Sequence, residues 1–130
     1  MALPQTDIDA LLGRGRPFTS TDENGTTCLV FPKWPLPPGF TRTDADLLIR
    51  LSPGYPDIPP DMWWFDPSVR RVDGKDIEAT QVMEAYLGRS WQRWSRHLTA
   101  GQWNAGSDSL EGFLALVQTE LDKAARTPVQ

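Results

Sequence analysis

The chain has 130 residues, of which 39% are hydrophobic and 23% are charged, and its formal net charge at pH 7 is −4. This length and composition predict one folded domain over residues 1–130, with a core over about residues 6–126, rather than a disordered chain. The acidic balance and the lack of a basic run argue against nucleic acid as the main ligand.

The sequence contains no apolar stretch close to the roughly 20 residues that span a bilayer, so no membrane partner is expected. Its first residues lack the basic start and apolar run of a signal peptide. The single cysteine, Cys28, has no partner for an internal disulfide, and we therefore expect the reducing cytoplasm as the location. Cys28 alternates with apolar neighbours in a β-prone segment, which favours a buried, unreactive side chain.

Residues 6–12 predict a short N-terminal helix. Thr6 is a suitable N-cap, and Asp7 and Asp9 fall in the first turn, where the helix dipole favours negative charge. Gly13 follows the last apolar residue of this segment and is expected to end the helix.

Four strands are predicted next, over residues 17–21, 27–31, 47–51 and 62–65. Asn24-Gly25 separates the first two strands and is the strongest short hairpin signal. Between the third and fourth strands, Pro56, Pro59 and Pro60 fix the backbone and remove three donors, so a rigid extended corner is expected. The four strands are predicted to form an antiparallel meander in sequential order.

The last helix has the clearest pattern. Asp108 is its expected N-cap, and Glu111 completes a capping box. The apolar residues recur at helical spacing, at Leu110, Phe113, Leu114, Val117 and Leu121. Together these elements predict an α+β fold, with an N-terminal helix, a four-stranded antiparallel meander and a C-terminal helix.

This order resembles the ubiquitin-conjugating enzyme (UBC) fold. The resemblance is closest to the bacterial branch that is often encoded with ubiquitin-like proteins, activating enzymes and deconjugases. It covers roughly residues 17–122 and rests on Leu36-Pro37-Pro38-Gly39-Phe40, the stretch from Tyr55 to Phe65, the stretch from Trp91 to His97, Trp103 and the capped helix.

The resemblance implies a site for a ubiquitin-like thioester, which these enzymes carry on a cysteine. Counting back about eight residues from Trp103 leads to Ser95, and counting forward about 25 from Tyr55 leads to Thr80. The bacterial branch keeps a histidine just after its cysteine, and Ser95-x-His97 fits that arrangement with serine in the cysteine's place. Ser95 is either natural or an engineered replacement.

By this resemblance, Ser95 and His97 are the candidate catalytic residues. The candidate partner-binding residues are Trp94, Arg96 and Trp103, although tryptophans in such a stretch are more often packing residues and arginines more often a solvated face.

Two functions follow from these expectations. The first is a conjugating-like protein that accepts a ubiquitin-like modifier from an activating enzyme and transfers it to an amine. The second is a catalytically inactive scaffold that binds a ubiquitin-like protein or a partner subunit. A role in antiphage defence is indicated only by the proteins with which this branch is encoded. One histidine and one cysteine do not make a metal site, and no glycine-rich phosphate loop is present, so no cofactor is expected.

Overall fold

The structure is a computed structural model, and it describes residues 9, 15, 17–55, 58, 60, 62–95 and 110–125. The predicted N-terminal helix over residues 6–12 lies outside the described residues, apart from Asp9. Arg96, His97 and Trp103 also lie outside them.

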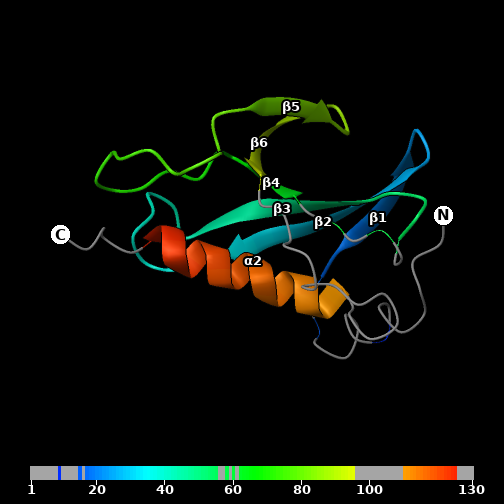
Figure 1. The fold of residues 1–130 in the computed structure, drawn as a ribbon, viewed down its shortest axis with the longest axis horizontal. Helices are drawn as coiled ribbons and strands as arrows, with labels where there is room; N and C mark the ends of the chain where they lie inside the picture. The colour runs from blue at the N-terminus through cyan, green and yellow to red at the C-terminus, as the bar shows by residue number, and fades with distance from the viewer. Residues whose placement is uncertain are drawn as a thin grey trace.

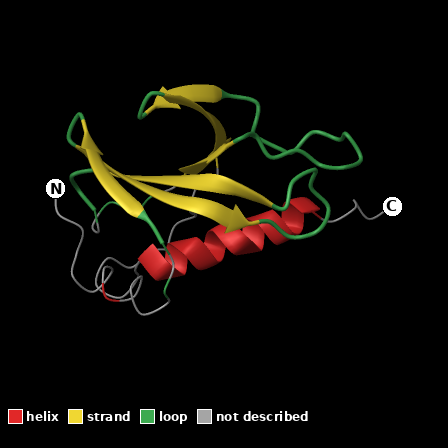
Figure 2. Cartoon of the chain, turned by 180° about the vertical axis from the view of Figure 1, so that it is seen from behind, coloured by secondary structure: helices red, strands yellow, loops and turns green. Residues whose placement is uncertain are grey.

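The described residues form one antiparallel sheet and one long helix (Figure 1). The strands lie in the order β1-β2-β3-β4-β6-β5. The helix α2 lies along one face of the sheet, below β2 and β3, whereas β5 and β6 curl away on the other side (Figure 2). The elements are β1 Thr19–Glu23, β2 Thr26–Pro35, β3 Asp44–Leu51, β4 Met62–Asp66, β5 Met83–Tyr86, β6 Arg89–Ser95 and α2 Leu110–Ala125.

The predicted four-stranded meander is therefore wrong, because residues 83–95 add a hairpin to the sheet, with β6 inserted between β4 and β5. The sequence pattern did not indicate β6, because side chains are buried on both faces of this strand. Trp91 is buried on one face, and Gln92 and Trp94 are buried together on the other. A strand that is covered on both faces lacks the apolar–polar alternation of a half-buried strand.

The turn of the β5–β6 hairpin also lacks the usual sequence signal. Leu87 and Gly88 occupy it with φ values of 53° and 73°, and tight hairpin turns favour such positive values. Asn24 and Gly25 do the same between β1 and β2, with φ values of 52° and 81°, and that predicted hairpin is confirmed. Leucine rarely adopts positive φ, so Leu87-Gly88 does not indicate a turn as Asn24-Gly25 does.

The predicted C-terminal helix is confirmed over Leu110–Ala125, with its apolar side buried. The Phe113 ring meets the Trp63 ring edge-on, with centroids 5.8 Å apart. Full burial of one such side chain stabilises the fold by about 1.5–3 kcal/mol. The predicted N-cap Asp108 lies outside the described residues. The buried side chains of α2 are those of Leu110, Phe113, Leu114, Val117 and Leu121.

The C-terminal end of α2 is held by the segment that follows β4. Nη1 of Arg71 donates to the carbonyl oxygen of Ala124, which satisfies a carbonyl that a helix leaves without an intrahelical partner. Arg71 also forms an ion pair with Asp73, with 2.6 Å between Nη2 and Oδ2. The hydrogen bond from Arg71 holds the pKa of Asp73 well below its usual range. Gly39 lies against the same end of the helix, because a Cβ there would be 2.7 Å from the carbonyl oxygen of Ala125.

The face of the sheet opposite α2 carries a second, smaller core of Cys28, Leu48, Trp64 and Trp91. Tyr86 of β5 packs against it, with its ring 5.5 Å from that of Trp64 in an edge-on arrangement. Because the β5–β6 hairpin curls over this face, apolar side chains are buried on both faces of the sheet. The prediction that Cys28 is buried is confirmed, since its side chain is 0% exposed.

Labelling of Cys28 by a thiol reagent should be on the order of 100-fold slower in the folded protein than in the unfolded chain, because the thiol reacts only after local opening. The measurement is the rate of mass increase with and without denaturant. The chain has one cysteine, so the reaction reports this position alone. Equal rates in the two conditions would contradict the burial of Cys28.

Candidate active site

Ser95 is the last residue of β6, and its backbone is held on both sides. It lies opposite Met62 of β4 in the antiparallel register. On the other side, its N–H donates to the carbonyl oxygen of Ala79 at 3.1 Å. The side chain is half-buried. Position 95 is thus at the end of a strand with defined neighbours.

The segment beside Ser95 belongs to the connection between β4 and β5. The N–H of Arg93 donates to the carbonyl oxygen of Val82 at 2.9 Å, so this segment follows the edge of β6 for several residues. Thr80 is buried, and its hydroxyl donates to the carbonyl oxygen of Ile77 at 2.8 Å. The two counts along the sequence, to Thr80 and to Ser95, therefore arrive at segments that contact each other.

Trp94 is a core residue. Its side chain is 0% exposed, and its ring is stacked on that of Trp63 with centroids 6.2 Å apart. It also meets Phe65 edge-on at 5.6 Å. A buried indole is not available to a partner protein, so we do not carry Trp94 into the proposed site. The contacts of Arg96, His97 and Trp103 lie outside the described residues.

Gln92 is a buried residue that the sequence analysis did not identify. Its Oε1 accepts from the backbone N–H of Val69 at 2.8 Å and from Nε1 of Trp94 at 3.0 Å. Its Nε2 donates to the carbonyl oxygen of Val69 at 3.1 Å. The amide therefore ties the start of the β4–β5 connection to β6. A lone glutamine between tryptophans is the only signal of this role in the sequence.

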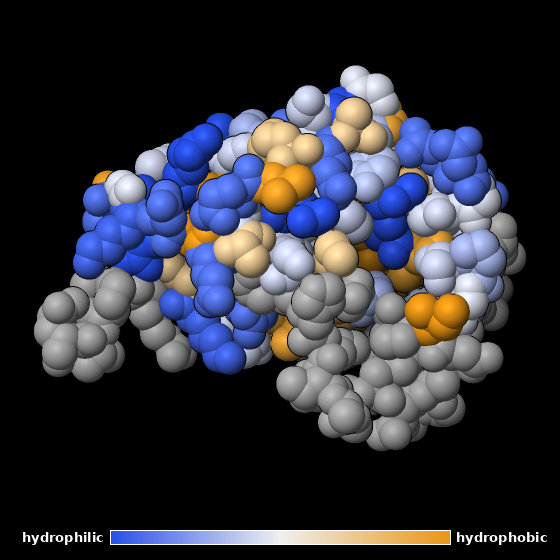
Figure 3. Space-filling view, turned by 45° about the horizontal axis from the view of Figure 1, so that its top comes forward, coloured by the Kyte–Doolittle hydropathy of each residue, from blue (hydrophilic) through white to orange (hydrophobic). Residues whose placement is uncertain are grey.

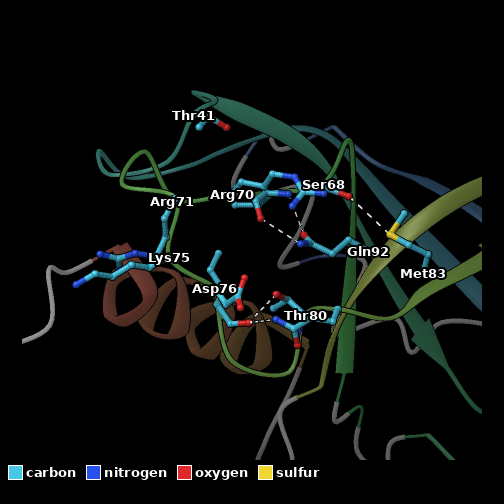
Figure 4. Close-up of a pocket in the computed structure, with 13 residues that line it drawn as sticks. Thr41, Ser68, Arg70, Arg71, Lys75, Asp76, Thr80, Met83 and Gln92 are labelled. Carbon is cyan, nitrogen blue, oxygen red and sulfur yellow. Dashed lines mark hydrogen bonds between the residues drawn. The ribbon is translucent and has the colours of Figure 1, made fainter.

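A cavity of about 410 Å³ lies under the β4–β5 connection, beside Gln92 (Figure 4). Ser68 and Met83 lie near Gln92 at its sheet end, whereas Arg71 and Lys75 lie toward α2. The Ser68 hydroxyl donates to the sulfur of Met83 at 3.7 Å. Several of the polar groups here bond to one another or to the backbone, so we assign no ligand to this cavity.

A comparison with protein-family models gives a match to prokaryotic E2 family E over residues 3–124. The chain belongs to prokaryotic E2 family E. This confirms the resemblance to E2-like proteins of prokaryotes that the sequence motifs indicated. Searches of curated proteins and of solved structures with this chain gave no match.

Membership in this family implies a function related to the conjugation of ubiquitin-like proteins. It also points in general to a ubiquitin-like protein and an activating enzyme as partners. The matched residues include the whole sheet, Ser95 and all of α2 except Ala125. A serine hydroxyl is almost fully protonated near neutral pH, so it is a poor nucleophile unless a neighbouring base activates it.

In the described part of the chain, no helix is both long and apolar enough to cross a membrane. The same residues contain no cluster of three or more His, Cys, Asp and Glu side chains that could hold a metal ion.

Proposed function

We propose that this protein is a ubiquitin-conjugating-like protein whose modifier-bearing position is residue 95. In the form with cysteine at this position, the thiolate attacks the carbonyl carbon of the thioester on the activating enzyme. A new carbon–sulfur bond forms, and the thiolate of the activating enzyme leaves. A target amine then attacks the same carbonyl, an amide forms, and the thiol is released as the amine loses a proton.

The observation that carries this proposal is the position of Ser95 at the end of β6. Its backbone is held between Met62 and Ala79, and its side chain is half-buried, so a nucleophile here is fixed and still open to solvent. A fixed nucleophile lowers the entropic cost of reaction. In this proposal His97, two residues further on, orients the attacking amine or donates a hydrogen bond to the oxyanion.

The test is to charge Ser95→Cys with the cognate activating enzyme, ATP and the ubiquitin-like protein. A thiolate forms a thioester that reductant cleaves, so we expect a reductant-sensitive adduct on Ser95→Cys. The measurement is a gel of each reaction with and without reductant.

The unaltered chain is the matched control, because it retains Cys28 and differs only at position 95. A reductant-sensitive adduct of equal yield on the unaltered chain would move the modifier to Cys28 and contradict the proposal. Absence of an adduct on Ser95→Cys, while the activating enzyme is demonstrably charged, would also contradict it.

The second candidate function is a catalytically inactive scaffold that binds a ubiquitin-like protein or a partner subunit. The serine at position 95 favours the scaffold function, because a serine hydroxyl cannot form a thioester and transfers a modifier poorly. Binding of the ubiquitin-like protein without an adduct on Ser95→Cys is the result expected for a scaffold.

A further inference from the structure

The segment that holds Ser95 on the side away from β4 has an irregular backbone. The N–H of Arg93 donates to the carbonyl oxygen of Val82 at 2.9 Å. Two residues further along β6, the N–H of Ser95 donates to the carbonyl oxygen of Ala79 at 3.1 Å. Ala79 and Val82 are three residues apart in the chain, so the segment has one extra residue opposite β6. Such β-bulges often lie next to active sites, where they change the direction of a backbone or side-chain group.

Ala79 has an unusual backbone conformation. It is the third residue of the turn over residues 77–80, and its φ is 57°. A residue with a Cβ rarely adopts such a φ, and glycine usually occupies the third position of a turn that requires it. Strained residues of this kind persist only where the surrounding structure holds them, and they concentrate at functional sites. The direction of the Ala79 carbonyl oxygen therefore depends on the contacts of its neighbours.

Two side chains hold the turn around Ala79. The Thr80 hydroxyl and Nε2 of Gln81 both donate to the carbonyl oxygen of Ile77 at 2.8 Å (Figure 4). The Oε1 of Gln81 accepts from the backbone N–H of Thr80 at 3.1 Å. Ile77 is buried in the core that packs on α2, and Thr80 is buried as well. The turn is thus anchored in the core at one end and bonded to Ser95 at the other.

We propose that Thr80 and Gln81 are positioning residues for the reaction at residue 95, an inference that rests on the proposed function. Their hydrogen bonds fix the direction of the Ala79 carbonyl oxygen. That oxygen holds the backbone of residue 95 on the side opposite its regular pairing with β4. Neither side chain takes part in the chemistry. A reacting group displaced by about 1 Å can lose on the order of 100-fold in rate, so loosening this turn should slow transfer.

The first test measures the backbone of Ser95 in a chain that keeps its serine. Thr80→Val removes the hydroxyl donor at nearly the same side-chain volume, so the Ser95 amide should exchange with solvent about tenfold faster. Thr80→Ser keeps the hydroxyl and should leave the exchange rate within about twofold of its original value. The matched control is Thr119→Val on α2, where the exposed Thr119 hydroxyl donates to the carbonyl oxygen of Ala115 at 3.1 Å.

The second test places the same variants in the Ser95→Cys background and measures charging by the activating enzyme. Positioning acts on the reacting atoms, so Thr80→Val should lower kcat by about tenfold and leave KM for the charged activating enzyme unchanged. Thr80→Ser should restore kcat, and Thr119→Val should leave both constants unchanged. Urea unfolding of each variant shows whether the chain is folded under the assay conditions.

Gln81→Leu provides the same test if Thr80→Val does not fold. Gln81 is exposed, and its replacement removes the donor to Ile77 and the acceptor of the Thr80 N–H, so the same fall in kcat is expected. The surface over the β5–β6 side mixes hydrophobic and hydrophilic side chains without one large apolar area, so a further leucine is tolerated there (Figure 3). Gln118→Leu is the matched control, because it removes only an exposed bond on α2.

Four results would overturn the inference. They are a kcat in Thr80→Val equal to that of Ser95→Cys alone, an equal loss in Thr119→Val, a loss that Thr80→Ser does not restore, and an unchanged exchange rate of the Ser95 amide in Thr80→Val. The proposed function fails in a different way. If Ser95→Cys with Thr80 intact forms no adduct although the activating enzyme is charged, the proposed function fails and the positioning role fails with it.

Discussion

Trp94→Ala is expected to lower the free energy of unfolding by about 3–5 kcal/mol, the usual cost of removing a large aromatic side chain from a core. The Trp94 side chain is fully buried, stacked on Trp63 and in edge-on contact with Phe65. Its removal leaves a void and also leaves Gln92 without the Nε1 donor. The measurement is the midpoint and slope of urea unfolding.

Val82→Ala is the control for this variant, because the Val82 side chain is 43% exposed and only its backbone carbonyl bonds to Arg93. It should change the unfolding free energy by less than about 0.5 kcal/mol. A loss below about 1 kcal/mol in Trp94→Ala, with an unchanged slope, would show that Trp94 is not a core residue and would return it to the partner-binding candidates.

Gln92→Leu is expected to destabilise the fold by about 2–4 kcal/mol, since leaving a buried polar group unsatisfied costs about 1–3 kcal/mol. Leucine fills nearly the same space but removes three hydrogen bonds, two to the backbone of Val69 and one from Trp94. Urea unfolding gives the loss in stability. Hydrogen exchange should show faster exchange of the Val69 amide, because this N–H loses its acceptor.

Gln118→Leu is the matched control, because the same replacement on α2 removes only an exposed bond to Asp122 at 3.3 Å. Its effect should stay within about 0.5 kcal/mol. If Gln92→Leu and Gln118→Leu have the same small effect, then Gln92 does not hold the β4–β5 connection against β6.

The parts of the fold that could be predicted from the sequence depend on near neighbours in the chain. Asn24-Gly25 provides the positive φ values that its hairpin requires, and the helical spacing over residues 110–121 marks one buried face. Leu47 and Leu48 were expected beside the strand over residues 62–65, and they pair with Phe65 and Trp64. The turn residues and the helical spacing are local signals, so they predict structure without knowledge of the rest of the molecule.

The β5–β6 hairpin could not be predicted in the same way. Its turn places Leu87 at positive φ, which leucine adopts only when the surrounding structure compensates. Side chains are buried on both faces of β6, because α2 packs on one side and the curl of the sheet covers the other. The polar residues Gln92 and Arg93 therefore occupy strand positions where a pattern-based prediction expects apolar residues.

The candidate site shows the same division. Motif spacing led to Ser95, where the sequence has serine in the place of the cysteine that the resemblance implies. The neighbours Met62 and Ala79 were not predictable, because the register of β6 against β4 depends on which side chains the two faces bury.

The amino-acid order alone was sufficient for the family, the C-terminal helix and the first hairpin, because each is encoded in residues close together or in characteristic spacing. The order of the strands and the role of Gln92 exist only in the folded chain. Gln92 and Val69 are 23 residues apart, and β6 lies between β4 and β5 although β5 precedes it in the chain. Hydrogen bonds and packing between distant segments are cooperative, so no local pattern specifies them.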